Sequence, residues 1–106
     1  MKFLALWIQP RGGAGPDGTK LQELYRLFGE MAKAGAMKDS GGWAPGAPRT
    51  TVRAGAGAKT GGPSDGDNVV GYLVIDAASE KDAQQWCTRW AGLAGDGHCE
   101  LFAVPG

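Results

Sequence analysis

Three segments that are predicted to form β-strands carry apolar side chains on both faces, and this limits the possible folds more than any other feature. In residues 2–8, one face holds Phe3, Ala5 and Trp7, and the other holds Leu4, Leu6 and Ile8. Residues 69–75 repeat this arrangement, and residues 99–104 form a third apolar strand. Side chains alternate between the faces of a sheet, so both faces of a sheet built from these strands must be covered.

Two helices are predicted to provide part of that cover. Residues 19–34 place an apolar residue at every third or fourth position, as in an amphipathic helix, and the stripe consists of Leu21, Leu24, Tyr25, Phe28, Met31 and Ala32. Thr19 with Gln22 predicts a capping box at its start. Residues 79–91 predict a second helix, capped by Ser79, whose inner face holds Ala83, Trp86, Cys87 and Trp90.

The rest of the chain is predicted to complete an α+β fold. Residues 37–43 and 50–54 are weaker strands that would form a loose hairpin, and a flexible connection would follow at 55–68. The expected order is β-α-β-β-β-α-β, as in a ferredoxin-like fold with an antiparallel sheet and both helices on one face. Two helices cover only one face of such a sheet. We therefore expect a second copy to cover the other face and form a homodimer.

Length and composition exclude several classes of protein. The chain has 106 residues, which is enough for a single domain spanning residues 1–106. Its formal net charge is zero, which argues against nucleic acid as a partner. No apolar stretch approaches the roughly 20 residues that a membrane span needs, so we expect no membrane partner and a cytoplasmic location. Cys87 and Cys99 are expected to be reduced thiols, without a disulfide.

Several motifs suggest cofactor or metal sites but do not fit them. Residues 13–18 match the glycine pattern of dinucleotide-binding loops, but Pro10 and its neighbours separate them from the preceding strand, and the helix begins after the last glycine. Residues 55–60 lack two positions of a phosphate-binding loop. His98 is the only histidine and has no metal-ligand spacing around it. We therefore expect no cofactor and no metal.

A cationic segment with a nearby tryptophan is the main candidate for ligand binding. Between Ser40 and Ser64 there are three cations, Arg49, Arg53 and Lys59, and no acid. Trp43 lies at the same end of the expected hairpin, so this region could bind a small anion. The alternative is that these cations are solvated or paired across strands. Asp65 and Asp67 could act as an acid–base pair, or could simply form a turn around Gly66.

The same segments, in this order, resemble the YCII-related family of small proteins, in its DGPF branch. Residues 1–6 resemble the opening strand of that family, 50–53 its third strand, and 70–76 with 79–86 its Gly-Tyr strand and second helix. Gly62-Pro63 falls at its signature Asp-Gly-Pro-Phe turn, and Glu100 and Val104 lie in its closing strand. The resemblance implies a ferredoxin-like subunit within a dimeric α/β barrel. Some relatives resemble lactone isomerases or dehalogenases.

The chain departs from that family at positions that bear on activity. Gly61 and Ser64 replace the Asp and Phe of the signature turn, and Phe102 stands where an arginine is common. No histidine precedes His98, so a histidine–aspartate pair proposed for one branch has no counterpart here. The catalytic residues therefore stay unassigned.

Two hypotheses of function follow. The first is a homodimeric small-molecule-binding domain that acts by cofactor-free acid–base chemistry of the lyase or isomerase kind. Its pocket would be lined by Trp43, Arg53, Asp65 and Tyr72, with Arg53 holding an anionic group and Asp65 moving a proton. The alternative is a non-catalytic domain for protein interaction or regulation. Convergence of Arg53, Asp65 and Tyr72 on one cavity would favour the first hypothesis, and scatter would favour the second.

Overall fold

The computed structural model describes residues 1–43, 47–61 and 68–105. The elements follow in the order β1 (Lys2–Gln9), α1 (Gly18–Lys33), β2 (Met37–Gly42), β3 (Arg49–Arg53), β4 (Gly57–Gly61), β5 (Asn68–Asp76), α2 (Glu80–Ala91) and β6 (His98–Val104). The α+β class and the two predicted helices are confirmed. Within the described ranges, no helix is both long and apolar enough to cross a membrane.

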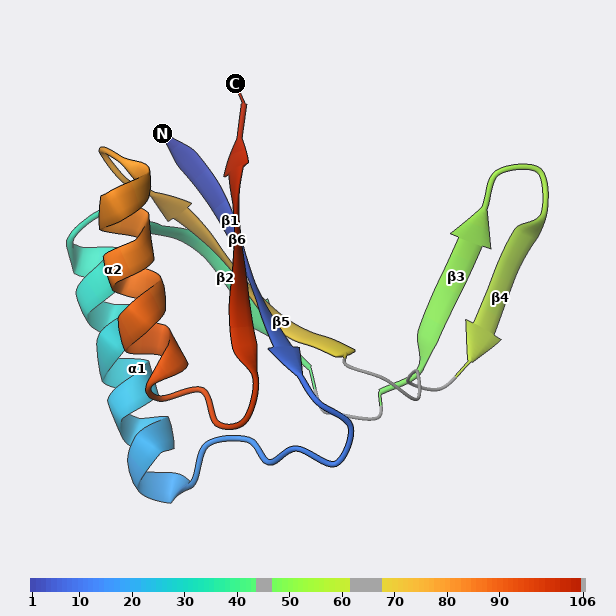
Figure 1. Ribbon diagram of the computed structural model, residues 1–106, viewed down its shortest axis with the longest axis horizontal. Helices are drawn as coiled ribbons and strands as arrows, with labels where there is room; N and C mark the ends of the chain where they lie inside the picture. The colour runs from blue at the N-terminus through green and yellow to red at the C-terminus, as the bar shows by residue number, and fades with distance from the viewer. Residues whose placement is uncertain (44–46, 62–67, 106) are drawn as a thin grey trace.

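Four strands form one antiparallel sheet in the order β2-β5-β1-β6 (Figure 1). Of the three strands predicted to be apolar on both faces, β1 and β5 lie at its centre and β6 lies at its edge. Leu6 at the middle of β1 pairs with Tyr72 on β5 and with Glu100 on β6. The register of β1 with β5 shifts between Trp7 and Ile8, which is a β-bulge close to the end of the strand.

The predicted hairpin between residues 37–43 and 50–54 is wrong. Strand β2 pairs with β5, whereas β3 pairs with β4, a strand that lies within the expected connection at 55–68. The glycines at 55 and 57 both have positive φ and make the tight turn between β3 and β4. The small residues of β4 gave no apolar alternation that would have indicated a strand.

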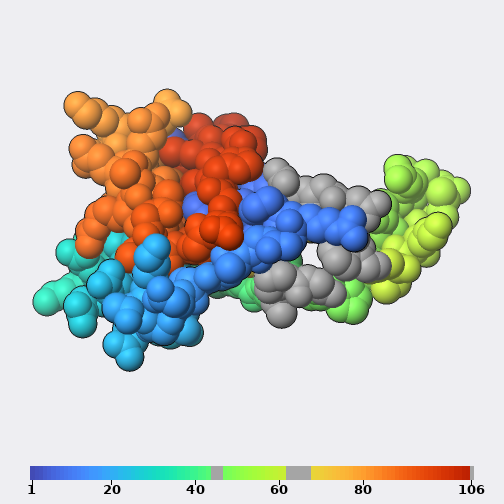
Figure 2. All heavy atoms as spheres, turned by 60° about the horizontal axis from the view of Figure 1, so that its bottom comes forward, coloured from blue at the N-terminus to red at the C-terminus, as the bar shows by residue number. Residues whose placement is uncertain are grey.

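The β3–β4 hairpin projects from the main sheet. Figure 1 shows it well separated from the helices, and Figure 2 shows it at one end of the molecule. Its residues are exposed, and Val52, the apolar residue of β3, is 73% exposed. Thr50 and Thr60 join the two strands by a hydrogen bond between their hydroxyl groups of 2.8 Å.

The helix boundaries depend on local caps. Helix α1 begins after Asp17, whose carboxylate accepts a hydrogen bond from the backbone N–H of Lys20, so the predicted capping box at Thr19 is wrong. Ser79 caps α2 as predicted, because its hydroxyl accepts from the N–H of Asp82. Gly35, with φ +74°, ends the first helix as expected.

Both helices pack on the same face of the sheet (Figure 1). The core between them holds Phe3, Ala5, Trp7, Leu24, Leu27, Met31, Leu73, Ile75, Ala83, Cys87 and Trp90. Within residues 1–43, 47–61 and 68–105, no helix covers the other face. Its central strand carries Leu4, Leu6 and Ile8, which are only partly buried, and Phe102 beside Leu4 is 50% exposed. We call the side of the sheet that holds these four residues the open face.

Candidate functional site

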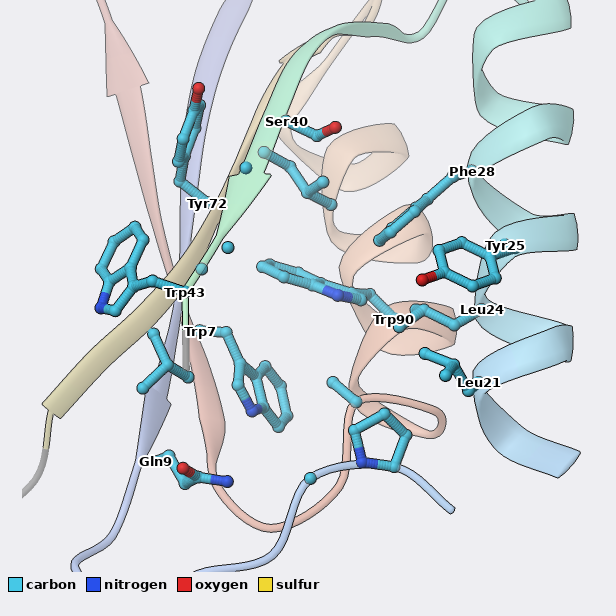
Figure 3. A pocket seen from close by; sticks show the side chains of 18 residues that line it. Trp7, Gln9, Leu21, Leu24, Tyr25, Phe28, Ser40, Trp43, Tyr72 and Trp90 are labelled. Carbon is cyan, nitrogen blue, oxygen red and sulfur yellow. The ribbon is translucent and has the colours of Figure 1, made fainter. Parts of the chain in front are cut away.

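A cavity of about 550 Å³ lies between the helix-covered face of the sheet and α1. Figure 3 shows Trp7 and Gln9 on the sheet side, Leu21, Leu24, Tyr25 and Phe28 on α1, and Trp90 of α2 between them. The remaining lining comes from Gly15, Pro16, Ser40, Gly41, Gly42, Trp43, Val70, Gly71, Tyr72, Leu73 and Ala94. Ligand sites of small proteins usually have a volume in this range.

The cavity exists because α1 and the sheet do not meet along their whole length. Toward the C-terminal end of α1, Leu27 and Met31 are buried against the core. Toward its N-terminal end, Leu21 is 36% exposed and Tyr25 is 65% exposed, although both belong to the predicted apolar stripe. The facing part of the sheet carries little side-chain bulk, since Gly42 of β2 pairs with Gly71 of β5 there. The apolar stripe of α1 is thus left partly uncovered over a hollow.

Aromatic rings form much of the cavity wall. The rings of Trp7 and Trp90 lie with their centroids 5.5 Å apart and their planes tilted by 52°. This geometry is typical of a favourable aromatic pair, and it fixes two large flat surfaces beside the cavity. Phe28 and Tyr25 approach from the α1 side (Figure 3).

Two polar groups lie at one end of this apolar cavity. Gln9 is 4% exposed and is the one buried polar residue among those the structure describes. The indole Nε1–H of Trp7 is buried and has no hydrogen-bond partner within the described part of the chain. Figure 3 places Gln9 next to the nitrogen-bearing side of the Trp7 ring. Buried polar groups are nearly always hydrogen-bonded, so the Trp7 N–H is an exception, and Gln9 is the polar side chain of the lining that could contact a ligand.

Of the four predicted site residues, two lie at this cavity. Trp43 and Tyr72 border it, but their side chains lie on the side of the strands away from α1 (Figure 3). Arg53 lies at the end of β3, in the projecting hairpin, and is exposed. Asp65 lies outside the described residues. The cavity and the cationic segment are thus separate parts of the molecule.

Tyr72 forms a polar pair with Asp39 on the open face. Its hydroxyl donates a hydrogen bond of 3.1 Å to the Asp39 carboxylate. This hydrogen bond raises the pKa of Tyr72 above its usual value of 10.0, because ionisation would place a second negative charge beside Asp39. The Tyr72 ring lies over Gly41, where a Cβ would stand 2.5 Å from a ring carbon. A side chain at position 41 would therefore displace the ring.

His98 is paired with Glu100, two residues further along β6, through a contact of 3.1 Å between Nε2 and Oε1. Both side chains are about half exposed. Asp96, the other acid considered beside His98, instead accepts a hydrogen bond from the backbone N–H of Ala14. It thereby holds the glycine-rich connection after β1 against the turn before β6. Among the described residues, no group of three or more histidines, cysteines and acids is arranged to hold a metal ion.

The two cysteines are reduced and lie side by side. Cys87 on α2 is buried, Cys99 on β6 is partly buried, and neither forms a disulfide. The hydrogen bond between them lowers the pKa of Cys87 and raises that of Cys99. They join the helix to the edge strand on the helix-covered side of the sheet.

The sequence reasoning missed Gln9, Tyr25 and Trp7 as residues of a site. One signal was available for Gln9: it continues the alternation of Phe3, Ala5 and Trp7, and so had to point toward the helices. A polar residue at an inward position of an apolar strand calls for a partner.

No protein-family model matches this chain, and no curated protein matches it significantly.

Proposed function

We propose that this protein is a homodimeric small-molecule-binding domain whose ligand occupies the cavity between the sheet and α1. The observation that carries the proposal is a cavity of about 550 Å³ with aromatic walls and with the buried polar residue Gln9 in its lining. A mostly apolar hollow with a few fixed polar groups is the usual form of a ligand site. Binding by apolar contact needs no catalytic group. Catalysis of the lyase or isomerase kind would need Asp65 or another acid to move a proton.

The open face supports the homodimer. Its apolar residues form a strip along β1, with Phe102 of β6 half exposed at its edge and the polar pair of His98 and Glu100 beside Ile8 and Leu6. A second copy related by a two-fold axis would cover this strip with the same strip of its own. The strand order β2-β5-β1-β6, with both helices on one side, supports a ferredoxin-like subunit. Pairing through the open faces would give the dimeric α/β barrel of the YCII-related family. For the location we propose the cytoplasm, because the two free thiols suit a reducing compartment.

A thermal-shift screen tests the ligand site. The protein would be screened against a set of neutral and anionic aromatic fragments. Each stabilising compound would then be measured on Ser40→Phe, which places a ring into the cavity from β2. The matched control is Thr51→Phe, which adds the same ring to the exposed hairpin. We expect stabilisation to be lost in Ser40→Phe and kept in Thr51→Phe. Equal stabilisation of both variants would show that the ligand binds elsewhere.

A non-catalytic interaction domain is the second candidate, and one observation favours it. Arg53 lies on a hairpin that projects from the sheet, and it does not line the cavity with Tyr72. An exposed hairpin with three cations, Arg49, Arg53 and Lys59, would fit an acidic protein surface. A variant with all three replaced by glutamine separates the candidates. The interaction domain would be supported if this variant no longer bound an acidic partner protein but was still stabilised by the ligand of the cavity.

A further inference from the structure

We infer that the ligand is a neutral aromatic molecule of at least two fused rings that carries a carbonyl oxygen as its hydrogen-bond acceptor. This inference rests on the proposed function, because it names the chemical class that the proposed site would take. It depends on three properties of the lining: its aromatic walls, its lack of charge within the described residues, and the arrangement of Gln9 and Trp7 at one end.

The walls favour a flat ring system. Trp7 and Trp90 present large rings at a fixed tilt, and Phe28 and Tyr25 lie on the opposite side of the cavity. Aromatic rings in proteins prefer tilted or offset contacts with other rings, each worth more than the apolar area alone. A ligand with fused rings can touch both sides of the cavity at once, whereas a small aliphatic acid would leave it largely empty.

The lining favours a neutral ligand. Among the described residues that line the cavity there is no lysine, arginine, histidine, aspartate or glutamate. An ion moved from water into such surroundings loses its hydration without gaining an ion pair. The cations that suggested an anionic ligand, Arg53 among them, lie on the projecting hairpin.

The polar end favours an acceptor on the ligand. The Trp7 indole N–H is a donor only, and it is closed to water. Figure 3 places Gln9 and the nitrogen of the Trp7 ring at the same end of the cavity. If the Gln9 carbonyl oxygen accepts a hydrogen bond from this N–H, the Gln9 NH₂ group is the donor that is left for a ligand. An NH₂ group donates, so the ligand has to supply an oxygen that accepts.

Three naphthalene derivatives of similar shape test this class. The ketone 2-acetylnaphthalene carries the acceptor, 2-isopropylnaphthalene lacks it, and 2-naphthoate carries a charge. Dissociation constants would be measured by isothermal titration calorimetry on the unaltered protein, on Gln9→Met, and on Gln84→Met as the matched control. Gln84 lies exposed on α2, away from the cavity. Gln9→Met keeps the length of the side chain and removes its NH₂ group.

We expect the ketone to bind at least about tenfold more tightly than 2-naphthoate, because the charge is not compensated in the cavity. Gln9→Met should weaken the ketone about three- to tenfold, the usual value of one neutral hydrogen bond, and leave the hydrocarbon unweakened. Gln84→Met should change neither. Trp7→Phe removes the N–H donor together with part of the ring. It should weaken the binding of the ketone more than the binding of the hydrocarbon.

Two results would overturn the inference while the proposed site stands. One is binding of 2-naphthoate as tight as that of the ketone, with Ser40→Phe abolishing both. The other is an equal effect of Gln9→Met on ketone and hydrocarbon. If none of the three compounds binds the unaltered protein, and the fragment screen also finds no ligand sensitive to Ser40→Phe, then the proposed function fails as well.

Discussion

Replacement of Phe102 by serine should separate the two copies of the proposed dimer without unfolding either. Phe102 lies on the open face of β6, beside Leu4 of β1, and half of its surface is exposed in the single chain. Its side chain makes no contribution to the core under the helices. The substitution therefore removes apolar area mainly from the proposed interface.

The size of the effect follows from the exposed half of the ring. A phenylalanine side chain buries about 200 Å² when it is fully covered, so pairing would cover roughly a further 100 Å² in each copy. At about 25 cal/mol per Å², this gives roughly 2.5 kcal/mol per copy and roughly 5 kcal/mol per dimer. The dissociation constant of the dimer would rise by about 5,000-fold. If only half of this area is covered, the rise is about 70-fold.

Sedimentation equilibrium over a range of protein concentrations would measure this constant for both proteins. Tyr25→Ser is the matched control, since Tyr25 is 65% exposed but lies on α1, on the other side of the sheet. We expect the control to keep the dissociation constant of the unaltered protein. Thermal unfolding at a concentration where both proteins are monomeric should show similar midpoints for Phe102→Ser and the unaltered chain.

The reasoning would be refuted by an unaltered protein that sediments as a monomer at micromolar concentration. In that case the apolar strip of the open face would be in contact with water. A dimer that Phe102→Ser leaves intact would show that the copies associate through another surface, such as the projecting hairpin.

Three further predictions concern single residues. In a Tyr25→Phe background, absorbance titration at 295 nm should give a pKa for Tyr72 above 10, and Asp39→Asn should lower that pKa. The stability that this pair contributes is fully present below pH 10 and is lost as the pH rises through the raised pKa of Tyr72. An unshifted pKa would contradict the hydrogen bond between Tyr72 and Asp39. Gly29→Ala, in the middle of α1 with nothing near its added Cβ, should raise the free energy of unfolding by about 1 kcal/mol in urea denaturation. Gly97→Ala should lower the free energy of unfolding by more than about 2 kcal/mol, because φ at this position is +131° and the new Cβ would lie 2.2 Å from the Ile8 carbonyl oxygen. Equal free energies of unfolding for Gly29→Ala and Gly97→Ala would refute both predictions.

Much of the main sheet could be predicted from local pattern. Strands β1 and β5 were recognisable because apolar side chains occupy residues 3–8 and most of 69–75, and α2 because Ser79 caps it and its apolar residues recur at helical spacing. The start of α1 was misplaced by one residue, because Asp17 competes with Thr19 for the cap and the sequence pattern does not decide between them.

The pairing of β2, β3 and β4 could not be predicted in the same way. These strands are short and rich in glycine, threonine and charged residues, so no apolar face specifies their register. Proximity in sequence favoured a hairpin between β2 and β3. The structure instead places β2 beside β5, where the ring of Tyr72 fills the space above Gly41. That contact joins residues far apart in the chain, and no local pattern reveals it.

The candidate site was harder to predict because it results from an incomplete contact. Periodicity shows which residues of α1 face the sheet, but not how far the helix stands from it. Leu21 and Tyr25 satisfy the apolar pattern as well as Leu27 does, yet they line a hollow. The prediction instead used charge, which drew attention to Arg53 on the hairpin. Charged residues are mostly exposed, so a cluster of them indicates a surface more often than a cavity.

The proposed dimer uses residues on one face of the sheet, and the proposed ligand site uses residues on the other face. Strand β1 contributes residues to both. On β1, Leu4, Leu6 and Ile8 belong to the open face, whereas Trp7 and Gln9 belong to the cavity. If the strand is rigid, ligand and dimer affinity are independent, and Phe102→Ser leaves the ligand constant unchanged. If the bulge between Trp7 and Ile8 moves when the cavity fills, the two equilibria are linked. Linkage is reciprocal, so each bound ligand would then change the dimer constant by the same factor by which dimerisation changes the affinity of its site. Sedimentation with and without a ligand of the cavity distinguishes these cases, and a ligand effect on the dimer constant that persists in Ser40→Phe would show that the compound acts outside the cavity.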